Sequence, residues 1–223
     1  MSTAKVNTSE ITSEIMLAEQ LTRGYKKKAK TRQALVDAAL RIYARRGVGE
    51  LTLNELADEA SVSHGTIYNY FRTREEVLEA VGLALANQLS QAISILSEGI
   101  DNGAQRMSIG IRMFIRRAIA DLAWANAVIH VIHYDEGIRS AVAGNVRHDL
   151  QMGLKEGSFV YSDEEIALAL VVSSTVGALN SITEGRAVVD HDIKHAEMLL
   201  KALGLSSTEA NRIAHLPLPI PSL

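Results

Sequence analysis

Apolar residues recur at helical spacing along almost the whole chain, and the period-two alternation typical of strands appears over no useful length. No proline occurs before Pro217, so the residue that most strongly breaks helices is absent until the tail. Glycines between the apolar stretches mark where one helix stops and another starts. The pattern therefore predicts an all-α fold.

The first three predicted helices are short and lie close together in the sequence. The first runs from about Thr31 to Arg46 and carries apolar residues on one face. The second runs from Thr52 to about Glu59, and Glu55 completes a capping box with Thr52. After a three-residue turn, Ser63 can cap a third helix that extends to Phe71.

The remaining chain predicts a larger, antiparallel helical bundle. A fourth helix opens near Thr73 and runs through Leu85, and further helices are expected at about 87–98, 104–133, 138–156, 163–184, 191–203 and 207–215. We divide the chain into an N-terminal arm at residues 1–22, expected to be mobile, a small helical domain at 23–75 and the bundle at 76–223.

The composition excludes several classes of chemistry. The 223 residues include no cysteine, which excludes disulfides, thiolate metal sites, iron–sulfur clusters and cysteine nucleophiles. No uninterrupted apolar run approaches the roughly 18 residues of a membrane span, and the acidic N-terminal segment does not resemble a signal peptide. We therefore expect a soluble, cytoplasmic protein.

Charge is distributed unevenly along the chain. The net charge is −3, but residues 23–74 carry 11 Lys and Arg against 5 Asp and Glu, whereas residues 75–223 carry 11 against 18. A basic module joined to an acidic one indicates that only the first meets a polyanion.

The second and third helices have the spacing of a helix-turn-helix, whose second helix can enter the DNA major groove. Apolar residues of both helices can pack against the first helix. The side chains left to point outward are His64, Thr66, Asn69 and Tyr70. Their polar character suits contacts with DNA.

Residues 31–81 resemble the N-terminal domain of the tetracycline-repressor-type (TetR) transcriptional regulators. The run from Leu51 to Leu78 carries the resemblance, above all Gly65-Thr66-Ile67-Tyr68, with Phe71 three residues later, followed by a basic residue and a glutamate. The resemblance implies a homodimeric transcriptional regulator, a repressor, that binds a palindromic DNA operator and is released by a small-molecule ligand. It implies a three-helix DNA-binding domain followed by a bundle for ligand binding and dimerisation.

The same resemblance assigns roles to individual residues. It implies that Thr52, Tyr68 and Arg74 contact DNA phosphates, and that His64, Thr66 and Asn69 lie near bases. The full predicted DNA-binding set is Lys28, Lys30, Thr52, Ser63, His64, Gly65, Thr66, Tyr68, Asn69, Tyr70 and Arg74. Ser61 departs from the family because glycine is common in this turn, where a left-handed residue can be required.

Two of these assignments have a plainer alternative. Lys26 to Lys28 and Lys30 form a cationic arm that can follow the DNA backbone or enter a minor groove, or they are only a solvated lysine run. Tyr68 shares a helix face with Ile67 and Phe71, so it is either a core residue or a ring whose hydroxyl reaches a phosphate.

Sequence-specific binding by one short recognition helix normally needs two copies about one DNA turn apart, so we expect a homodimer. The helices near 163–184 and 191–203 are the candidates for the interface, with intrachain core as the alternative. The first presents Ile166, Leu170, Ser173, Ser174, Gly177 and Ser181, and the second presents Ile193, Ala196, Leu199, Leu200 and Leu203.

In the resembling family the bundle encloses a small-molecule pocket. The candidate lining residues are Met113, Phe114, Trp124, His130, His133, Tyr134 and Thr175, each of which is otherwise a plain core residue. The aromatic content of 4% favours a compact or aliphatic ligand, apolar or amphipathic in character, over a large aromatic one.

We expect no cofactor, no metal site and no enzymatic activity. His130 and His133 lie three residues apart on a predicted helix, but two imidazoles without further ligands do not make a metal site. No phosphate-binding loop or activated nucleophile is evident. The alternatives to a specific repressor are a non-specific DNA-coating protein and, further off, a helical-bundle enzyme.

Overall fold

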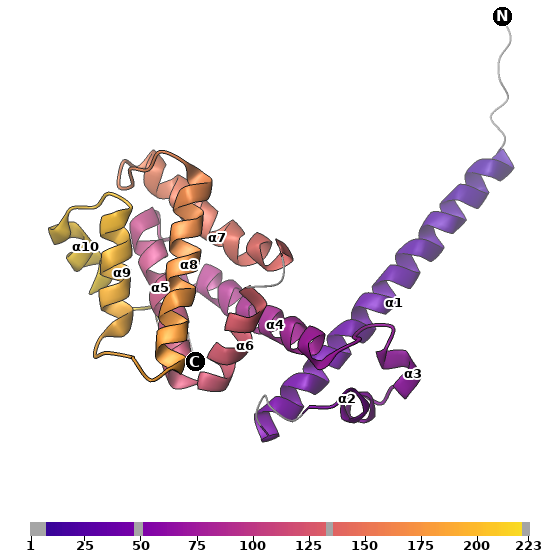
Figure 1. Cartoon of the computed structure of the whole chain (residues 1–223). Helices are drawn as coiled ribbons and strands as arrows, with labels where there is room; N and C mark the ends of the chain where they lie inside the picture. Colours follow the sequence, from indigo (N-terminus) through magenta and orange to yellow (C-terminus); the bar gives the residue numbers. More distant parts are fainter. Residues whose placement is uncertain (1–7, 47–50, 133–135, 220–223) are drawn as a thin grey trace, which may run out of the picture. The chain divides into compact units, whose positions relative to one another are not determined.

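The computed structural model describes residues 8–46, 51–132 and 136–219, and within these ranges all regular structure is helical (Figure 1). The helices are α1 (Thr8–Arg46), α2 (Leu53–Glu59), α3 (His64–Ile67), α4 (Arg74–Leu96), α5 (Gly103–Ala120), α6 (Leu122–Ile132), α7 (Glu136–Lys155), α8 (Glu164–Thr183), α9 (His191–Ala202) and α10 (Ser207–Ala214). The predicted all-α fold is confirmed. The chain forms two compact units, Met1–Arg74 and Glu75–Leu223.

The first unit is built around a small apolar core. Leu35 and Ile42 of α1, Leu56 of α2, Ile67 of α3 and Phe71 just after α3 are all buried. The guanidinium of Arg32 also lies 5.3 Å from the centre of the Phe71 ring, which closes one side of this core. The three helices are thereby held as a helix-turn-helix on a supporting helix.

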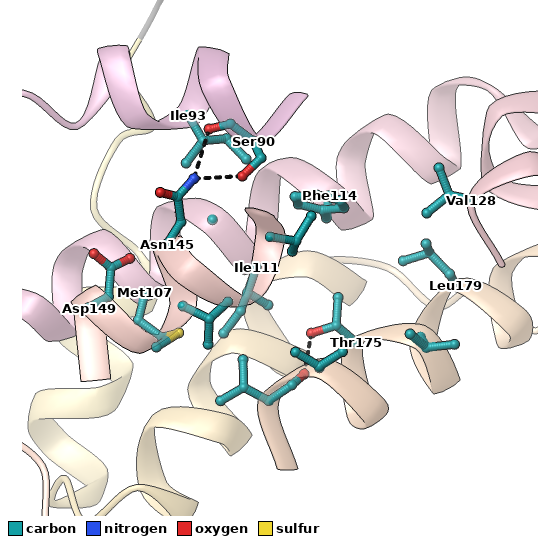
Figure 2. A pocket seen from close by; sticks show the side chains of 16 residues that line it. Ser90, Ile93, Met107, Ile111, Phe114, Val128, Asn145, Asp149, Thr175 and Leu179 are labelled. Carbon is teal, nitrogen blue, oxygen red and sulfur yellow. Dashed lines mark hydrogen bonds between the residues drawn. The ribbon is translucent and has the colours of Figure 1, made fainter. Parts of the chain in front are cut away.

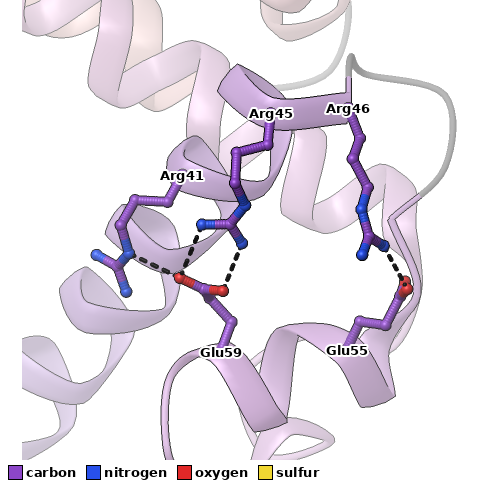
Figure 3. A network of polar contacts seen from close by, with 5 residues as sticks. All are labelled: Arg41, Arg45, Arg46, Glu55 and Glu59. Carbon is purple, nitrogen blue, oxygen red and sulfur yellow. Dashed lines mark hydrogen bonds and ion pairs between the residues drawn. The ribbon is translucent and has the colours of Figure 1, made fainter.

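Ion pairs also fasten α2 to α1 (Figure 3). Glu59 accepts from Arg41 Nε at 2.9 Å and from Arg45 Nη2 at 2.5 Å, and Glu55 accepts from Arg46 Nη1 at 2.9 Å. Arg45 and Arg46 therefore hold the supporting helix to the helix that precedes the turn.

The first helix is much longer than the sequence pattern predicts. We expected it to start near Thr31, after a mobile arm at residues 1–22, but α1 begins at Thr8. The reason is that residues 8–30 contain no proline and are rich in strong helix formers such as alanine, leucine, lysine and glutamate, although they lack a clear apolar face. Lys26 to Lys28 and Lys30 therefore lie on a helix rather than on an irregular arm.

In the second unit, α5 is the central helix and packs against α6, α7, α8, α9 and α10 (Figure 1). Its apolar face, with Met107, Ile111, Ile115 and Ala118, is buried in the main hydrophobic cluster. The spacing of these residues by three and four positions is what places them on one side of the helix.

Two predicted helix boundaries differ from the structure. The helix expected at 104–133 is two helices, because Asp121 leaves the helical conformation and its carboxylate accepts from Trp124 N at 2.9 Å, which caps α6. Conversely, the stretches ending at Leu85 and starting at residue 87 are one helix, α4.

A close approach between α5 and α7 depends on glycine. A Cβ atom at Gly153 would lie 2.2 Å from the Phe159 ring, and one at Gly103 would lie 2.4 Å from the backbone nitrogen of Gly153. Only hydrogen fits at both positions. These two glycines therefore set the contact between the start of α5 and the end of α7.

Helix α8 has one packed side and one uncovered side. By length and composition alone it could cross a membrane, but it packs against α5, α6 and α7 in the bundle. Ile166 and Leu170 are 69% and 40% exposed, and Ser173 and Gly177 on the same side are also exposed. The unit therefore leaves an apolar stripe on α8 that nothing in the chain's described part covers.

Candidate functional site

The turn between α2 and α3 has an unusual backbone conformation at one residue. Ser61 adopts φ 55°, in the left-handed region that glycine occupies without strain. The sequence-based expectation of a left-handed residue at this position is confirmed. The turn places α3 directly after α2, and the two helices pack against each other.

Serine and threonine side chains fix both ends of this turn. Thr52 and Glu55 form the predicted capping box at α2, with Glu55 N donating to Thr52 Oγ1 at 3.2 Å and Thr52 N donating to Glu55 Oε2 at 3.0 Å. Ser63 caps α3 by accepting from Thr66 N at 3.1 Å, and the hydroxyls of Ser63 and Thr66 lie 2.7 Å apart. Both predicted caps are confirmed.

Most of the predicted DNA-binding residues lie at the surface of the first unit. The exposed residues are Lys28, Lys30, Thr52, Ser63, His64, Gly65, Tyr68, Asn69 and Arg74, whereas Thr66 and Tyr70 are half-buried. The Tyr68 side chain is 53% exposed, so it is not a core residue. α3 is shorter than expected because residues 68–70 continue as turns rather than as regular helix.

His64 is held by the preceding helix. Its Nε2 lies 3.0 Å from Asp58 Oδ1, and the two side chains are 54% and 73% exposed. An exposed pair of this kind contributes little to stability, but it orients the imidazole at the surface of the turn.

Electrostatics reinforce the α1–α2 connection. Hydrogen bonds from Arg45 and Arg41 lower the pKa of Glu59 to about 2. The pKa of Glu55 is also lowered, mainly by hydrogen bonds from Thr52 and then by Arg46. Both carboxylates are therefore charged at any pH at which the helix-turn-helix would meet DNA.

The second unit contains a partly open cavity of about 90 Å³ between α4, α5, α6, α7 and α8 (Figure 2). Most of its wall is apolar, and polar side chains come from only a few positions. The lining residues are Ser90, Ile93, Met107, Gly110, Ile111, Phe114, Val128, Val142, Asn145, Val146, Asp149, Val171, Val172, Thr175, Val176 and Leu179.

The seven predicted ligand-binding residues divide into three groups. Phe114 and Thr175 line the cavity, whereas Met113 does not. Trp124 is buried behind the lining, with its ring 5.9 Å from that of Phe114. His130 is in α6, but its side chain is outside the described part of the structure, as are His133 and Tyr134 altogether.

Three lining residues that the sequence analysis did not single out form the polar end of the cavity. Asn145 Nδ2 donates to Ser90 Oγ at 2.6 Å, which links α7 to α4. Asp149, one turn further along α7, accepts from Arg106 Nε at 2.7 Å. Burial raises the pKa of Asp149, although the hydrogen bond and charge of Arg106 act in the opposite direction. In the sequence, the signal for this polar end was the pair of polar residues four positions apart, Asn145 and Asp149, on an otherwise packed face of α7.

The predicted dimer helices differ in what they expose. On α8, Ile166, Leu170, Ser173 and Gly177 are exposed, and Ser174 and Ser181 are half-buried. On α9 the prediction was wrong for Ala196, Leu199 and Leu200, and for Leu203 just after it, because these residues are buried in the core of their own chain. The exposed apolar residue of α9 is Met198, at 71%.

Models of two protein families match this chain. The model described as "Bacterial regulatory proteins, tetR family" matches residues 35–81, and the model described as "Tetracyclin repressor-like, C-terminal domain" matches residues 102–216. The two matches correspond to the helix-turn-helix and to most of the bundle, including the part of the cavity formed by α5 to α8.

Curated relatives are matched over part of their length. The HTH-type transcriptional regulator LuxR of Vibrio harveyi is 33% identical over 106 residues, which is 48% of this chain and 45% of that protein. The HTH-type nicotine-responsive transcriptional repressor HdnoR of Paenarthrobacter nicotinovorans is 31% identical over 97 residues, or 44% of this chain and 45% of that protein. The chain thus spans about half the length of these relatives.

A solved structure is similar over nearly the whole chain. The structure of RolR in complex with resorcinol has a TM-score of 0.75 and 27% sequence identity, and the match covers 89% of this chain and all of that one. RolR without ligand gives a TM-score of 0.72 at 26% identity. Since the C-terminal family model alone matches more than half of the residues and the N-terminal model covers the helix-turn-helix, this chain belongs to the tetR family of bacterial transcriptional regulators.

Proposed function

We propose that this protein is a homodimeric repressor that binds a palindromic DNA operator and leaves it when a small molecule occupies the cavity of the bundle. The observation that carries the proposal is the presence, in one chain, of an exposed recognition turn and an apolar-walled cavity. A ligand can release DNA only if it binds the DNA-incompetent conformation more tightly than the competent one. Such a repressor acts in the cytoplasm, where the operator is.

The residues around α3 are suited to two kinds of DNA contact. Arg74, Lys28 and Lys30 supply positive charge for phosphates, and the exposed Tyr68 hydroxyl can donate to a phosphate oxygen. His64 and Thr66 lie at the start of α3, the end of a recognition helix that meets base edges in a helix-turn-helix. The first group sets affinity and the second sets sequence preference.

The uncovered stripe on α8 supports the dimer. Ile166 and Leu170 lie four residues apart on its exposed side, and Ser173 and Gly177 allow a second helix to approach closely. Pairing this stripe with its copy in a second chain buries the exposed apolar surface. It also supplies two recognition helices, which a palindromic operator requires at about one DNA turn apart.

DNA titrations by fluorescence anisotropy, at several salt concentrations, test the DNA-binding assignment. We expect Arg74→Ala to weaken binding to all sequences and to lower the salt slope by about one, because one phosphate contact is lost. Tyr68→Phe should weaken binding about 3- to 10-fold without changing that slope, because it removes an uncharged hydrogen bond. His64→Ala and Thr66→Ala should change the preferred sequence.

Matched controls come from the second unit. Arg186→Ala removes an exposed arginine, and Tyr161→Phe removes a buried hydroxyl that has no hydrogen-bond partner among the described residues. Neither should alter DNA binding. Equal affinity of the wild-type protein for operator and scrambled DNA would instead support the non-specific coating alternative.

Analytical ultracentrifugation tests the dimer, and Ile166→Asp should shift it towards monomer.

The second candidate, a helical-bundle enzyme, would need a metal site or a set of catalytic side chains. No group of three or more histidine, aspartate or glutamate side chains that could hold a metal ion occurs among the residues that the structure describes. Among the described lining residues, Asp149 supplies the one carboxylate of the cavity, and Arg106 pairs with it. The DNA-binding role is therefore the one that we propose.

A further inference from the structure

We propose that the cavity takes an uncharged molecule, no larger than one substituted ring, whose single hydroxyl group engages Ser90 and Asn145. This inference rests on the proposed function, because it names the chemical class of the effector. The walls, the charges and the size of the cavity support it.

The hydroxyl requirement follows from the link between α4 and α7 (Figure 2). Asn145 uses Nδ2 to reach Ser90 Oγ at 2.6 Å, and the backbone carbonyl oxygen of Ser90 lies 3.5 Å from the same nitrogen. Two hydrogen-bonding groups remain unused at this link. The Ser90 hydroxyl still has a proton to donate, and Asn145 Oδ1 can accept one. A ligand hydroxyl, which both donates and accepts, can satisfy the two groups together.

The remaining wall determines the body of the ligand. Apart from Ser90, Asn145, Asp149 and Thr175, the lining side chains are aliphatic, methionine or phenylalanine. Thr175 already donates its hydroxyl proton to the carbonyl oxygen of Val171 at 2.8 Å. Beyond the polar end, the cavity wall therefore favours an apolar ligand body and offers no further hydrogen-bond donor to the ligand.

The charges at the cavity exclude an anionic ligand. Among the side chains that the structure describes, no lysine, arginine or histidine lines the cavity, so an anion would find no cation among them. It would also meet the carboxylate of Asp149, whose side chain is 12% exposed. A cationic ligand is disfavoured as well, because Arg106 already pairs with Asp149 at 2.7 Å and also donates to the carbonyl oxygen of Ser97 at 2.6 Å. Burying an unpaired ligand charge against this largely apolar wall would cost binding free energy.

The volume of the cavity favours a small occupant. A dry apolar cavity of about 150 Å³ binds benzene, and this one is about 90 Å³. One ring therefore requires some movement of the wall, and a fatty acyl chain requires much more. The occupant is therefore of single-ring size.

Isothermal titration calorimetry with four single-ring probes tests this class directly. We expect phenol to bind, benzene to bind about 3- to 10-fold more weakly because it lacks one hydrogen bond, and benzoate and benzylammonium not to bind at millimolar concentration. Benzoate or benzylammonium binding as tightly as phenol, or no binding by any of the four probes, would overturn the proposal.

Two substitutions locate the binding. Ser90→Ala should weaken phenol binding about 3- to 10-fold and leave benzene binding unchanged, because only the hydroxyl contact is removed. Gly110→Leu should abolish binding of both, since a Cβ at this lining residue meets only Ile93, at 4.0 Å, and the longer side chain enters the cavity. Gly144→Leu is the matched control, because a Cβ there meets nothing within 4 Å.

The outcomes also separate this inference from the proposed function. If Ser90→Ala weakens phenol and benzene equally, or if Gly110→Leu still binds phenol, the ligand site is wrong. If the protein binds its operator specifically but fails these probe tests, only the effector class is overturned. If it binds no operator, the repressor proposal fails, whatever the probes do.

Discussion

His195 on α9 should make the bundle sensitive to acid. Its ring stacks on His191 with 6.4 Å between ring centres, and its Nε2 is buried and has no hydrogen-bond partner among the described residues. Burial, followed by the positive charge of His191, lowers the pKa of His195 to about 4. Replacing the imidazole by a phenyl ring, His195→Phe, keeps the stacking and removes the titration.

The size of the effect follows from proton linkage. In the unfolded chain a histidine takes up its proton near pH 6.5, whereas folded His195 does so near pH 4. Between these values the unfolded state binds more protons, so the free energy of unfolding falls as the pH falls. At 1.36 kcal/mol per pH unit, this residue alone removes at most about 2 kcal/mol between pH 7 and pH 5.

Urea unfolding at pH 7, 6 and 5, followed by the fluorescence of the single tryptophan, Trp124, measures this difference. We expect wild type to lose about 2 kcal/mol more than His195→Phe over this range, at equal protein concentration. His215→Gln, at an exposed position, is the control and should follow the wild-type profile. Parallel losses in wild type and His195→Phe would refute the assignment of a buried, neutral imidazole.

Three further substitutions test the packing. Ser61→Gly should stabilise the first unit by about 0.5–1 kcal/mol, seen as a higher thermal midpoint, because relief of the left-handed strain exceeds the added entropy of glycine. Gly153→Ala should destabilise the bundle by about 1–3 kcal/mol in urea unfolding, since its Cβ would overlap the Phe159 ring. Asp192→Asn should cost about 3 kcal/mol by the same assay, because it leaves Arg112, 4% exposed, without its carboxylate partner.

Local features of the first unit were predictable from the sequence because short-range chemistry determines them. The caps at Thr52 and Ser63 and the strained Ser61 depend on residues within a few positions of each other. The start of α1 was not predictable from periodicity, because residues 8–30 form a helix without a clear apolar face. The break at Asp121 was missed because the flanking segments are both apolar, although an aspartate three residues before Trp124 was a possible cap signal.

The residues that line the cavity could be predicted from the sequence only in part. Phe114 and Thr175 were predicted because they lie on helices whose apolar character pointed inward. Ser90, Asn145 and Asp149 were missed, since which faces of α4 and α7 meet is decided by tertiary packing between helices about 55 residues apart. A single sequence carries no direct record of such long-range pairs, although polar residues on a packed helix face indicate them.

The stripe on α8 has a consequence for how this surface can vary. In a two-fold symmetric pair the same patch serves as both halves of the contact, so each substitution is introduced twice and meets its own counterpart or neighbour. A charged residue in place of Ile166 would be desolvated in both chains and would meet a like charge, so its energetic cost would count twice. A conservative change that improves the contact would likewise count twice. In the proposed dimer, the sequence of α8 thereby determines which chains can pair through this stripe.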